Sequence, residues 1–117
     1  MVHCNRILGA LSRRPGKGSS ALGACNAAVE TLVKGIANDL GPRLRVNCVS
    51  PGLTRTNAFA GMPAEAQEKM FAGFGKAIPA GRAGEGDDIG HAVLFLLSSP
   101  FVTGVVLDVD GGAVIRP

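Results

Sequence analysis

The longest regular pattern of apolar and polar positions lies between residues 20 and 40. Apolar residues recur there at the three- and four-residue spacing of one helix face, while charged residues fall on the other faces. These apolar positions are Val29, Leu32, Val33, Ile36 and Leu40. Ser19 or Ser20 can cap the first free N–H groups, and Gly41-Pro42 cannot continue a helix. The pattern therefore predicts one long helix over residues 20–40.

A period-two pattern begins soon after this helix. Leu44, Val46 and Cys48 alternate with Arg45, Asn47 and Val49, which is typical of a short β-strand. A Pro-Gly pair at positions 51 and 52 then predicts a turn at the carboxyl end of the strand. A helix that leads directly into a strand is half of a βαβ unit, so we expect a parallel sheet.

The remaining patterns predict three shorter elements. Residues 63–76 predict an amphipathic helix, residues 87–97 a last helix and residues 103–109 a final strand, and residues 6–11 are a short apolar stretch. The apolar side of the amphipathic helix is Met70, Phe71 and Phe74, and the last helix is expected to face inward with Ile89, Val93, Leu96 and Leu97. Together these elements predict an α/β fold in a single domain, residues 1–117, with about three parallel strands and flanking helices.

The composition limits the size of the domain and its chemistry. With 117 residues, 46% hydrophobic but only 4% aromatic, the chain is expected to form one modest domain with a core of small aliphatic side chains. The chain contains no tyrosine, so it has no phenol that could act as an acid or base. Its net charge of +3 is mild.

The basic residues gather early, in the Pro/Gly/Ser-rich stretch of residues 12–20. Arg13, Arg14 and Lys17 could form a nucleic-acid patch, but no aromatic side chain is interleaved for base stacking. A phosphate-binding P-loop is rejected because Gly18, not Ser or Thr, follows Lys17. The acid-free start also has the composition of a transit peptide. A solvated basic loop is the preferred interpretation, and no nucleic-acid partner is expected.

Neither a metal site nor a membrane span is predicted. Cys4, Cys25 and Cys48 form no CxxC pair, so buried thiols in a reducing cytoplasm are expected. Asp87 and Asp88 are interpreted as first-turn acids favoured by the helix dipole. No apolar run is long enough to cross a membrane.

Two blocks of the sequence carry a family resemblance. The runs AAVETLVKGIANDLG and LRVNCVSPGLTRT, followed by IPAGRAGEGDDIGHAVLFLLSS and VTGVVLDVDGG, resemble the carboxyl-terminal half of a short-chain dehydrogenase/reductase. The resemblance begins at about Ile7 and implies part of a Rossmann-like, doubly wound sheet, with its central strand at residues 6–11. It also implies that residues 63–76 form a mobile lid over the substrate, with a helix covering the sheet edge as the alternative.

The resemblance implies catalytic positions that this sequence does not fill. The family uses a tyrosine as acid/base, a lysine one helical turn later and an upstream serine. Aligned on AAVE, the tyrosine position is Leu22, the lysine position is Asn26, and the serine position is Gly9, or Leu8 with the loop shifted by one. None of them matches. Neither His3, placed in a leading tail, nor His91 in the last helix is expected to replace them.

The resemblance also implies an NAD(P) coenzyme. This sequence retains only part of the family's surface that binds it. Pro51, Gly52 and Thr56 match the family residues that border the nicotinamide, whereas Thr54 stands where Ile or Val is common. The phosphate-cradling glycine motif belongs to an amino-terminal half that this sequence lacks. NAD(P) is therefore not expected to bind to this chain alone.

The sequence thus predicts a short-chain dehydrogenase/reductase-like protein that is inactive as this truncated chain. A non-catalytic oligomerisation or binding module, or a truncated gene product without a selected function, is the alternative. The small residues Gly23, Ala24, Ala27 and Ala28 permit close helix packing, and the family uses this region for dimers. A homo-oligomer formed through helix 20–40 and the last helix is therefore expected, with residues 94–101 taking part.

Overall fold

The computed structural model describes residues 2–4 and 9–115. In chain order the elements are strand β1 (Val2–Cys4), 3-10 helix η1 (Gly9–Ser12), α1 (Ser20–Leu40), β2 (Asn47–Pro51), 3-10 helix η2 (Asn57–Phe59), α2 (Ala64–Lys76), α3 (Gly86–Ser98) and β3 (Val106–Val109). Among the described residues, no helix combines the length and apolar character needed to cross a membrane.

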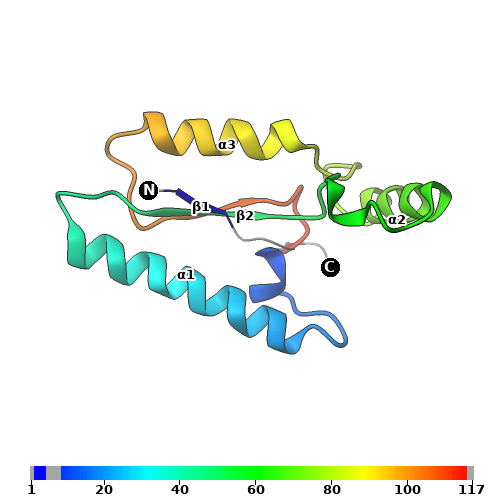
Figure 1. The fold of residues 1–117 in the computed structure, drawn as a ribbon, viewed down its shortest axis with the longest axis horizontal. Coiled ribbons are helices and arrows are strands. Elements are labelled where there is room, and N and C mark those ends of the chain that lie inside the picture. The colour runs from blue at the N-terminus through cyan, green and yellow to red at the C-terminus, as the bar shows by residue number, and fades with distance from the viewer. Residues whose placement is uncertain (1, 5–8, 116–117) are drawn as a thin grey trace.

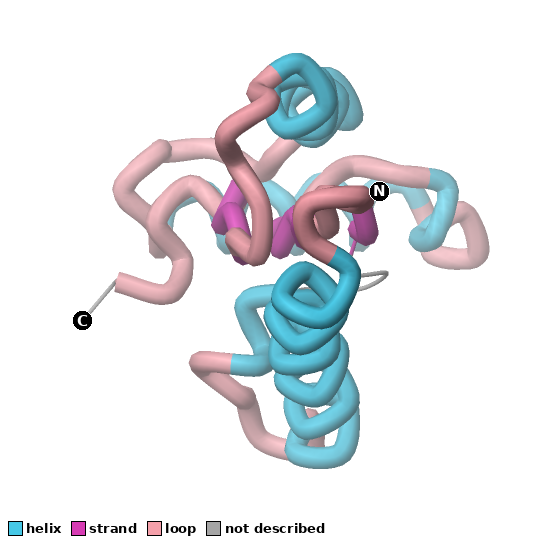
Figure 2. Tube along the Cα trace, turned by 90° about the vertical axis from the view of Figure 1, so that its left-hand side faces the viewer, coloured by secondary structure: helices cyan, strands magenta, loops and turns pink. Residues whose placement is uncertain are grey.

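The three strands form one parallel sheet in the order β1-β2-β3. The register places Cys48 of β2 between His3 of β1 and Val106 of β3. Helix α1 lies on one face of the sheet and α3 on the other, so the molecule has three layers (Figure 1). The end-on view shows the same layering, with the strands between the two helices (Figure 2). The predicted α/β fold with a parallel sheet is confirmed.

The first strand is not where the family resemblance placed it. It occupies Val2–Cys4, and Gly9–Ser12 forms a 3-10 helix in place of the predicted strand over residues 6–11. The rest of that prediction, residues 6–8, lies outside the described residues. Glycine, alanine and serine favour strands less than the β-branched Val2 does, which accounts for the shift. His3 therefore belongs to the sheet and not to a leading tail.

Helix α1 has the predicted bounds but a different buried face. The residues that face inward are Gly23, Asn26, Glu30, Val33 and Ala37. Leu32, predicted to be apolar contact surface, is 59% exposed. The stripe that faces the sheet is therefore small and polar in its first half and apolar in its second half. Ser19 does not cap the helix with its side chain, because its hydroxyl donates to the carbonyl of Gly16 at 2.7 Å.

Strand β2 is buried along its whole length, Asn47–Pro51, so the predicted alternation is wrong. Leu44, predicted to start the strand, lies before it and is exposed. A central parallel strand covered on both faces has no solvent side, which removes the period of two. The core beneath β2 consists of Val33, Ala37, Val46 and Cys48, with Ile36 and Val106 packed against it.

Helix α3 has a polar anchor at its carboxyl end. The guanidinium of Arg45 donates to the carbonyl oxygens of Leu96 and Leu97, both at 3.0 Å, and to that of Val102 at 2.8 Å. A cation at this end also complements the helix dipole. Leu96 is fully buried, but Leu97, predicted to face inward, is 54% exposed.

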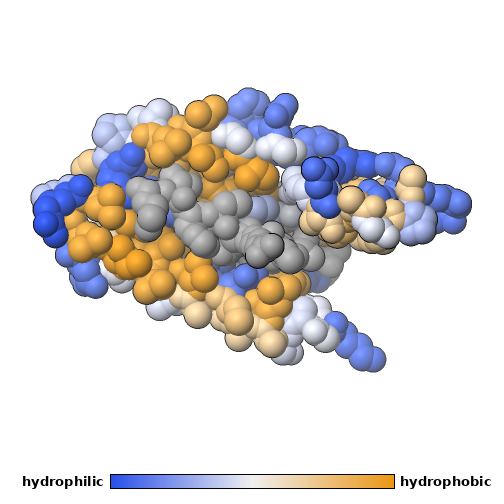
Figure 3. Space-filling model, in the orientation of Figure 1, coloured by the Kyte–Doolittle hydropathy of each residue, from blue (hydrophilic) through white to orange (hydrophobic). Residues whose placement is uncertain are grey.

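Helix α2 extends away from the sheet (Figure 1). Its predicted apolar side is confirmed: Phe71 is buried with Leu53 and Ala83, and Met70 and Phe74 pack on this cluster. Large apolar side chains remain exposed elsewhere, and apolar surface lies over both α3 and α1 in the space-filling view (Figure 3). The exposed residues of α3 are Leu94, Phe95 and Leu97, and Phe101 is fully exposed in the loop that follows.

Candidate functional site

A hollow of about 270 Å³ opens at the carboxyl edge of β2 and β3. In doubly wound folds this edge of the sheet is where ligands bind. The hollow is lined by residues from the end of β2, the segment before α3 and the turn after β3. They are Gly52, Leu53, Ala80, Arg82, Gly84, Asp88, Asp108, Val109, Asp110, Gly111 and Gly112.

The two turns at this edge hold each other in place. The Gly52 N–H donates to the carbonyl of Val109 at 3.0 Å, which extends the β2–β3 ladder by one residue. The Asp110 carboxylate accepts from the backbone N–H groups of Gly112 at 2.8 Å and Val114 at 2.9 Å. Because both of its oxygens have backbone donors and the residue is buried, Asp110 shapes the turn.

The predicted nicotinamide-bordering residues are near one another in sequence but differ in exposure. Pro51 and Gly52 are buried at the end of β2, and only Gly52 of the three lines the hollow. Thr56 is exposed, and its hydroxyl accepts from the Ala58 N–H at 3.3 Å at the start of η2. Thr54 is buried, and its hydroxyl donates to the carbonyl of Gly52 at 3.1 Å.

The positions that the resemblance gives to the catalytic residues are found on α1 and η1, which pack together. Leu22 lies in the first turn of α1 and is 38% exposed, whereas Asn26, one turn later, is buried. Gly9 begins η1, and the alternative position, Leu8, lies outside the described residues. Leu22 has no ionisable group, so nothing at this position can transfer a proton.

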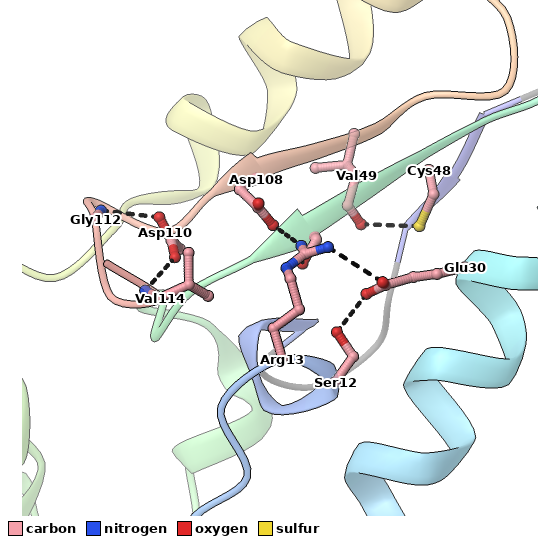
Figure 4. Close-up of polar contacts among 10 residues, drawn as sticks. Ser12, Arg13, Glu30, Cys48, Val49, Asp108, Asp110, Gly112 and Val114 are labelled. Atoms are coloured by element: carbon pink, nitrogen blue, oxygen red, sulfur yellow. Dashed lines mark hydrogen bonds and ion pairs between the residues drawn. The ribbon is translucent and has the colours of Figure 1, made fainter. Parts of the chain in front are cut away.

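Arg13 joins three elements on the α1 side of the sheet (Figure 4). Its guanidinium donates to Glu30 of α1 at 3.2 Å, to the Ser50 hydroxyl of β2 at 3.2 Å, and to Asp108 of β3. The Ser12 hydroxyl also donates to Glu30. The sequence pattern, which indicated a solvated loop, missed this role, because no local signal links residue 13 to residue 108.

Two more arginines make ion pairs near the site, and Arg82 is the one that lines the hollow. Arg82 donates twice to Asp88, both at 2.8 Å, and this guanidinium and then the Glu85 N–H hold the pKa of Asp88 well below its usual range. Arg55 donates to both oxygens of Glu68 on α2 and lies 4.4 Å from the Phe71 ring centre. The hydrogen bonds from Arg55 lower the pKa of Glu68.

Asp87 and Asp88 lie in the first turn of α3, as predicted, and His91 is exposed on the same helix. Within residues 2–4 and 9–115, no group of three or more His, Cys, Asp or Glu side chains could hold a metal ion. The carboxylates of the hollow instead accept hydrogen bonds from arginines and backbone N–H groups.

Comparison with known proteins agrees with this architecture. A family model described as "Enoyl-(Acyl carrier protein) reductase" matches residues 7–114. A 3alpha-hydroxysteroid dehydrogenase of Mediterraneibacter gnavus is 44% identical over 93 residues, which are 77% of this chain and 36% of the relative. Short-chain dehydrogenase/reductase ATR9 of Stachybotrys chlorohalonatus is 34% identical over 92% of this chain and 42% of its own length. The chain thus spans less than half of these relatives.

Solved structures give the same result. A small-chain dehydrogenase in complex with NADPH superposes with a TM-score of 0.89 at 39% identity, covering 97% of this chain and 50% of that protein. The aldohexose dehydrogenase of Thermoplasma acidophilum, without ligand, superposes with a TM-score of 0.84 at 33% identity, over 99% of this chain and 48% of that protein. With the parallel sheet, the two covering helices and a family match over nearly all residues, this chain belongs to the short-chain dehydrogenase/reductase family.

Proposed function

We propose that this chain is a short-chain dehydrogenase/reductase module that does not itself catalyse nicotinamide-dependent hydride transfer. The observation that carries the proposal is Leu22 at the tyrosine position, in a chain that contains no tyrosine. Reduction of a carbonyl needs a proton donor for the developing alkoxide, and an aliphatic side chain has no proton to give. Asn26, at the lysine position, carries no charge that could stabilise a phenolate.

The same reasoning applies to the coenzyme. One structural relative was solved with NADPH, and NAD(P) is the coenzyme that the resemblance implies. We infer that Pro51, Gly52 and Thr56 supply one wall beside the nicotinamide. Most of the anchoring of a dinucleotide is at the pyrophosphate and the adenosine ribose, through a glycine-rich turn and a helix N-terminus. This sequence has no such glycine motif, so this polypeptide should bind the coenzyme weakly or not at all.

Two measurements on the purified chain test this proposal. Coenzyme oxidation is followed with aldehydes and ketones, and coenzyme reduction with secondary alcohols, each beside a heat-killed sample. No turnover is expected, because losing members of a catalytic unit costs several orders of magnitude in rate. Calorimetric titration with NADH and NADPH separates lost chemistry from lost binding. Sustained turnover, or a dissociation constant in the low micromolar range, would contradict the proposal.

A second function, association, is supported by the exposed apolar surface. Ala24 and Ala28 of α1 are exposed and small, whereas Gly23, which the sequence placed on the same face, is buried. Leu94 and Phe101 add apolar surface beside α3. A stable pair needs to bury roughly 800 Å² per partner. We infer a homo-oligomer formed through α1 and α3.

Two further features bear on the cellular location of this module and on the kind of partner it has. Cys48 is buried, as predicted for the thiols, whereas Cys25 is exposed. Neither belongs to a CxxC pair, which suits a reducing compartment, and we infer a cytoplasmic location. Arg13, which could have contributed to a nucleic-acid patch, is used in contacts within the fold. This supports the inference that nucleic acid is not the partner.

A further inference from the structure

The end of η1 and the segment that links it to α1 lie directly on the first turns of α1. We call these residues, 11–19, the strap. A Cβ atom built on Gly23 would lie 2.6 Å from the Leu11 carbonyl oxygen and 3.5 Å from the Pro15 Cβ. The strap therefore contacts α1 at the residue next to Leu22, and only glycine at position 23 permits this approach.

The strap buries little apolar surface of its own. Residues 15–18 are exposed, and Leu11 is only half-buried. Burial of apolar area, the usual force that holds a segment to a fold, is therefore small here. The position of the strap must depend largely on its polar contacts.

Arg13 makes three of these contacts, and they reach far along the chain. Its partners are Glu30 on α1, Ser50 on β2 and Asp108 on β3, the last of them 95 residues away in sequence. The Glu30 side chain is only 10% exposed, and that of Asp108 is 33% exposed. Removing the partner of a partly desolvated carboxylate costs more stability than removing that of an exposed one, because the remaining charge stays poorly solvated.

We propose that Arg13, Glu30 and Asp108 form a latch that holds the strap closed over the start of α1, and that the strap opens locally when the latch is broken. Opening uncovers Gly23, the residue of the first turns of α1 on which the strap lies, while the sheet stays folded. The latch couples this part of α1 to β3. The inference depends on neither coenzyme binding nor association.

Trypsin provides a direct test on the full chain. Lys17 is exposed within the strap and precedes Gly18, whereas Arg14 precedes a proline, before which trypsin does not cut. In Asp108→Asn the strap sequence is unchanged, but the latch loses a charged partner. Cleavage after Lys17 should become roughly fivefold faster or more, the effect of losing a charge-assisted hydrogen bond on a local opening. Cleavage after Lys34, inside α1, should not change.

Two further variants make the result decisive. Asp87→Asn removes an exposed carboxylate on α3 and should leave cleavage after Lys17 unchanged. Arg13→Met should match or exceed Asp108→Asn, and the double variant should be cleaved no faster than Arg13→Met, because the two residues act through one contact. An unchanged rate in Asp108→Asn, effects that multiply in the double variant, or equal acceleration after Lys17 and Lys34 would each overturn the latch.

Discussion

Gly52 and Asp110 are in backbone contact across the carboxyl edge of the sheet. A Cβ atom on residue 52 would lie 2.7 Å from the Cα and 2.9 Å from the carbonyl oxygen of Asp110. Neither of these backbone atoms can rotate away, so a side chain at position 52 would force the two turns apart. The hollow between them has its shape because residue 52 is glycine.

Replacing Gly52 with alanine should therefore destabilise the fold by about 1–3 kcal/mol, the usual cost of overpacking. Urea unfolding followed by circular dichroism measures this loss. Gly61→Ala is the matched control, since a Cβ at Gly61 meets nothing within 4 Å. It should change the free energy of unfolding by less than about 0.5 kcal/mol. Equal effects of the two substitutions would argue against close contact at Gly52.

Arg45→Met should also destabilise the protein. The substitution keeps much of the aliphatic stem but leaves two carbonyl groups at the end of α3 and that of Val102 in the following loop without their guanidinium donor. A loss of about 1–3 kcal/mol is expected in the same unfolding experiment. Arg43→Met, which removes an exposed guanidinium two residues earlier, should have little effect. If both variants unfold at the wild-type urea concentration, Arg45 does not anchor α3.

The ion pair between Arg82 and Asp88 gives stability that depends on pH. Its hydrogen bonds depress the pKa of Asp88 in the folded state below the value of about 3.9 expected when unfolded. The stabilisation is therefore complete above pH 4 or so and is lost as the pH falls further. Asp88→Asn should weaken the acid dependence of unfolding in this window. Asp87→Asn, beside it on α3, serves as the control, and an identical acid profile for both variants would count against the pair.

Association through α1 should be sensitive to charge on its exposed small face. Ala28→Arg places a bulky cation there and should raise the dissociation constant of the oligomer by about tenfold or more, which corresponds to about 1.4 kcal/mol. Light scattering across a dilution series measures the change. Asn38→Arg adds the same charge at an exposed position elsewhere on α1 and should leave the mass unchanged. A wild-type monomer at tens of micromolar would refute the prediction.

The sequence predicted the bounds of α1 and the parallel sheet, but not which side of α1 faces that sheet. Helical spacing of large apolar residues pointed to Leu32, whereas the sheet-facing stripe carries Asn26 and Glu30. The burial of Glu30 depends on two donors, Arg13 and Ser12, that come from a different segment. Periodicity measures local amphipathicity and contains no information about such distant partners.

The candidate site, too, could be predicted from the sequence only in part. Pro51 and Gly52 could be found from a two-residue turn signal, because turns are encoded locally. The lining contributed by Asp110 and Arg82 could not, since these residues reach the same edge only after β3 and the segment before α3 are in place. A strand at residues 6–11 was expected from the resemblance, and the short apolar run there could not correct this, because such a run does not distinguish a strand from a helical turn.

The placement of α1 and α3 on opposite faces has a consequence for the handedness of the chain. The strands are parallel and follow one another across the sheet in sequence order. Both connections therefore step in the same direction, but one passes beneath the sheet and the other above it (Figure 1). Two such crossovers have opposite hands, so one of them is left-handed, whereas about 98% of these connections are right-handed. Because of that rare crossover, β2 has a helix on each face although the three strands follow one another in a single direction across the sheet.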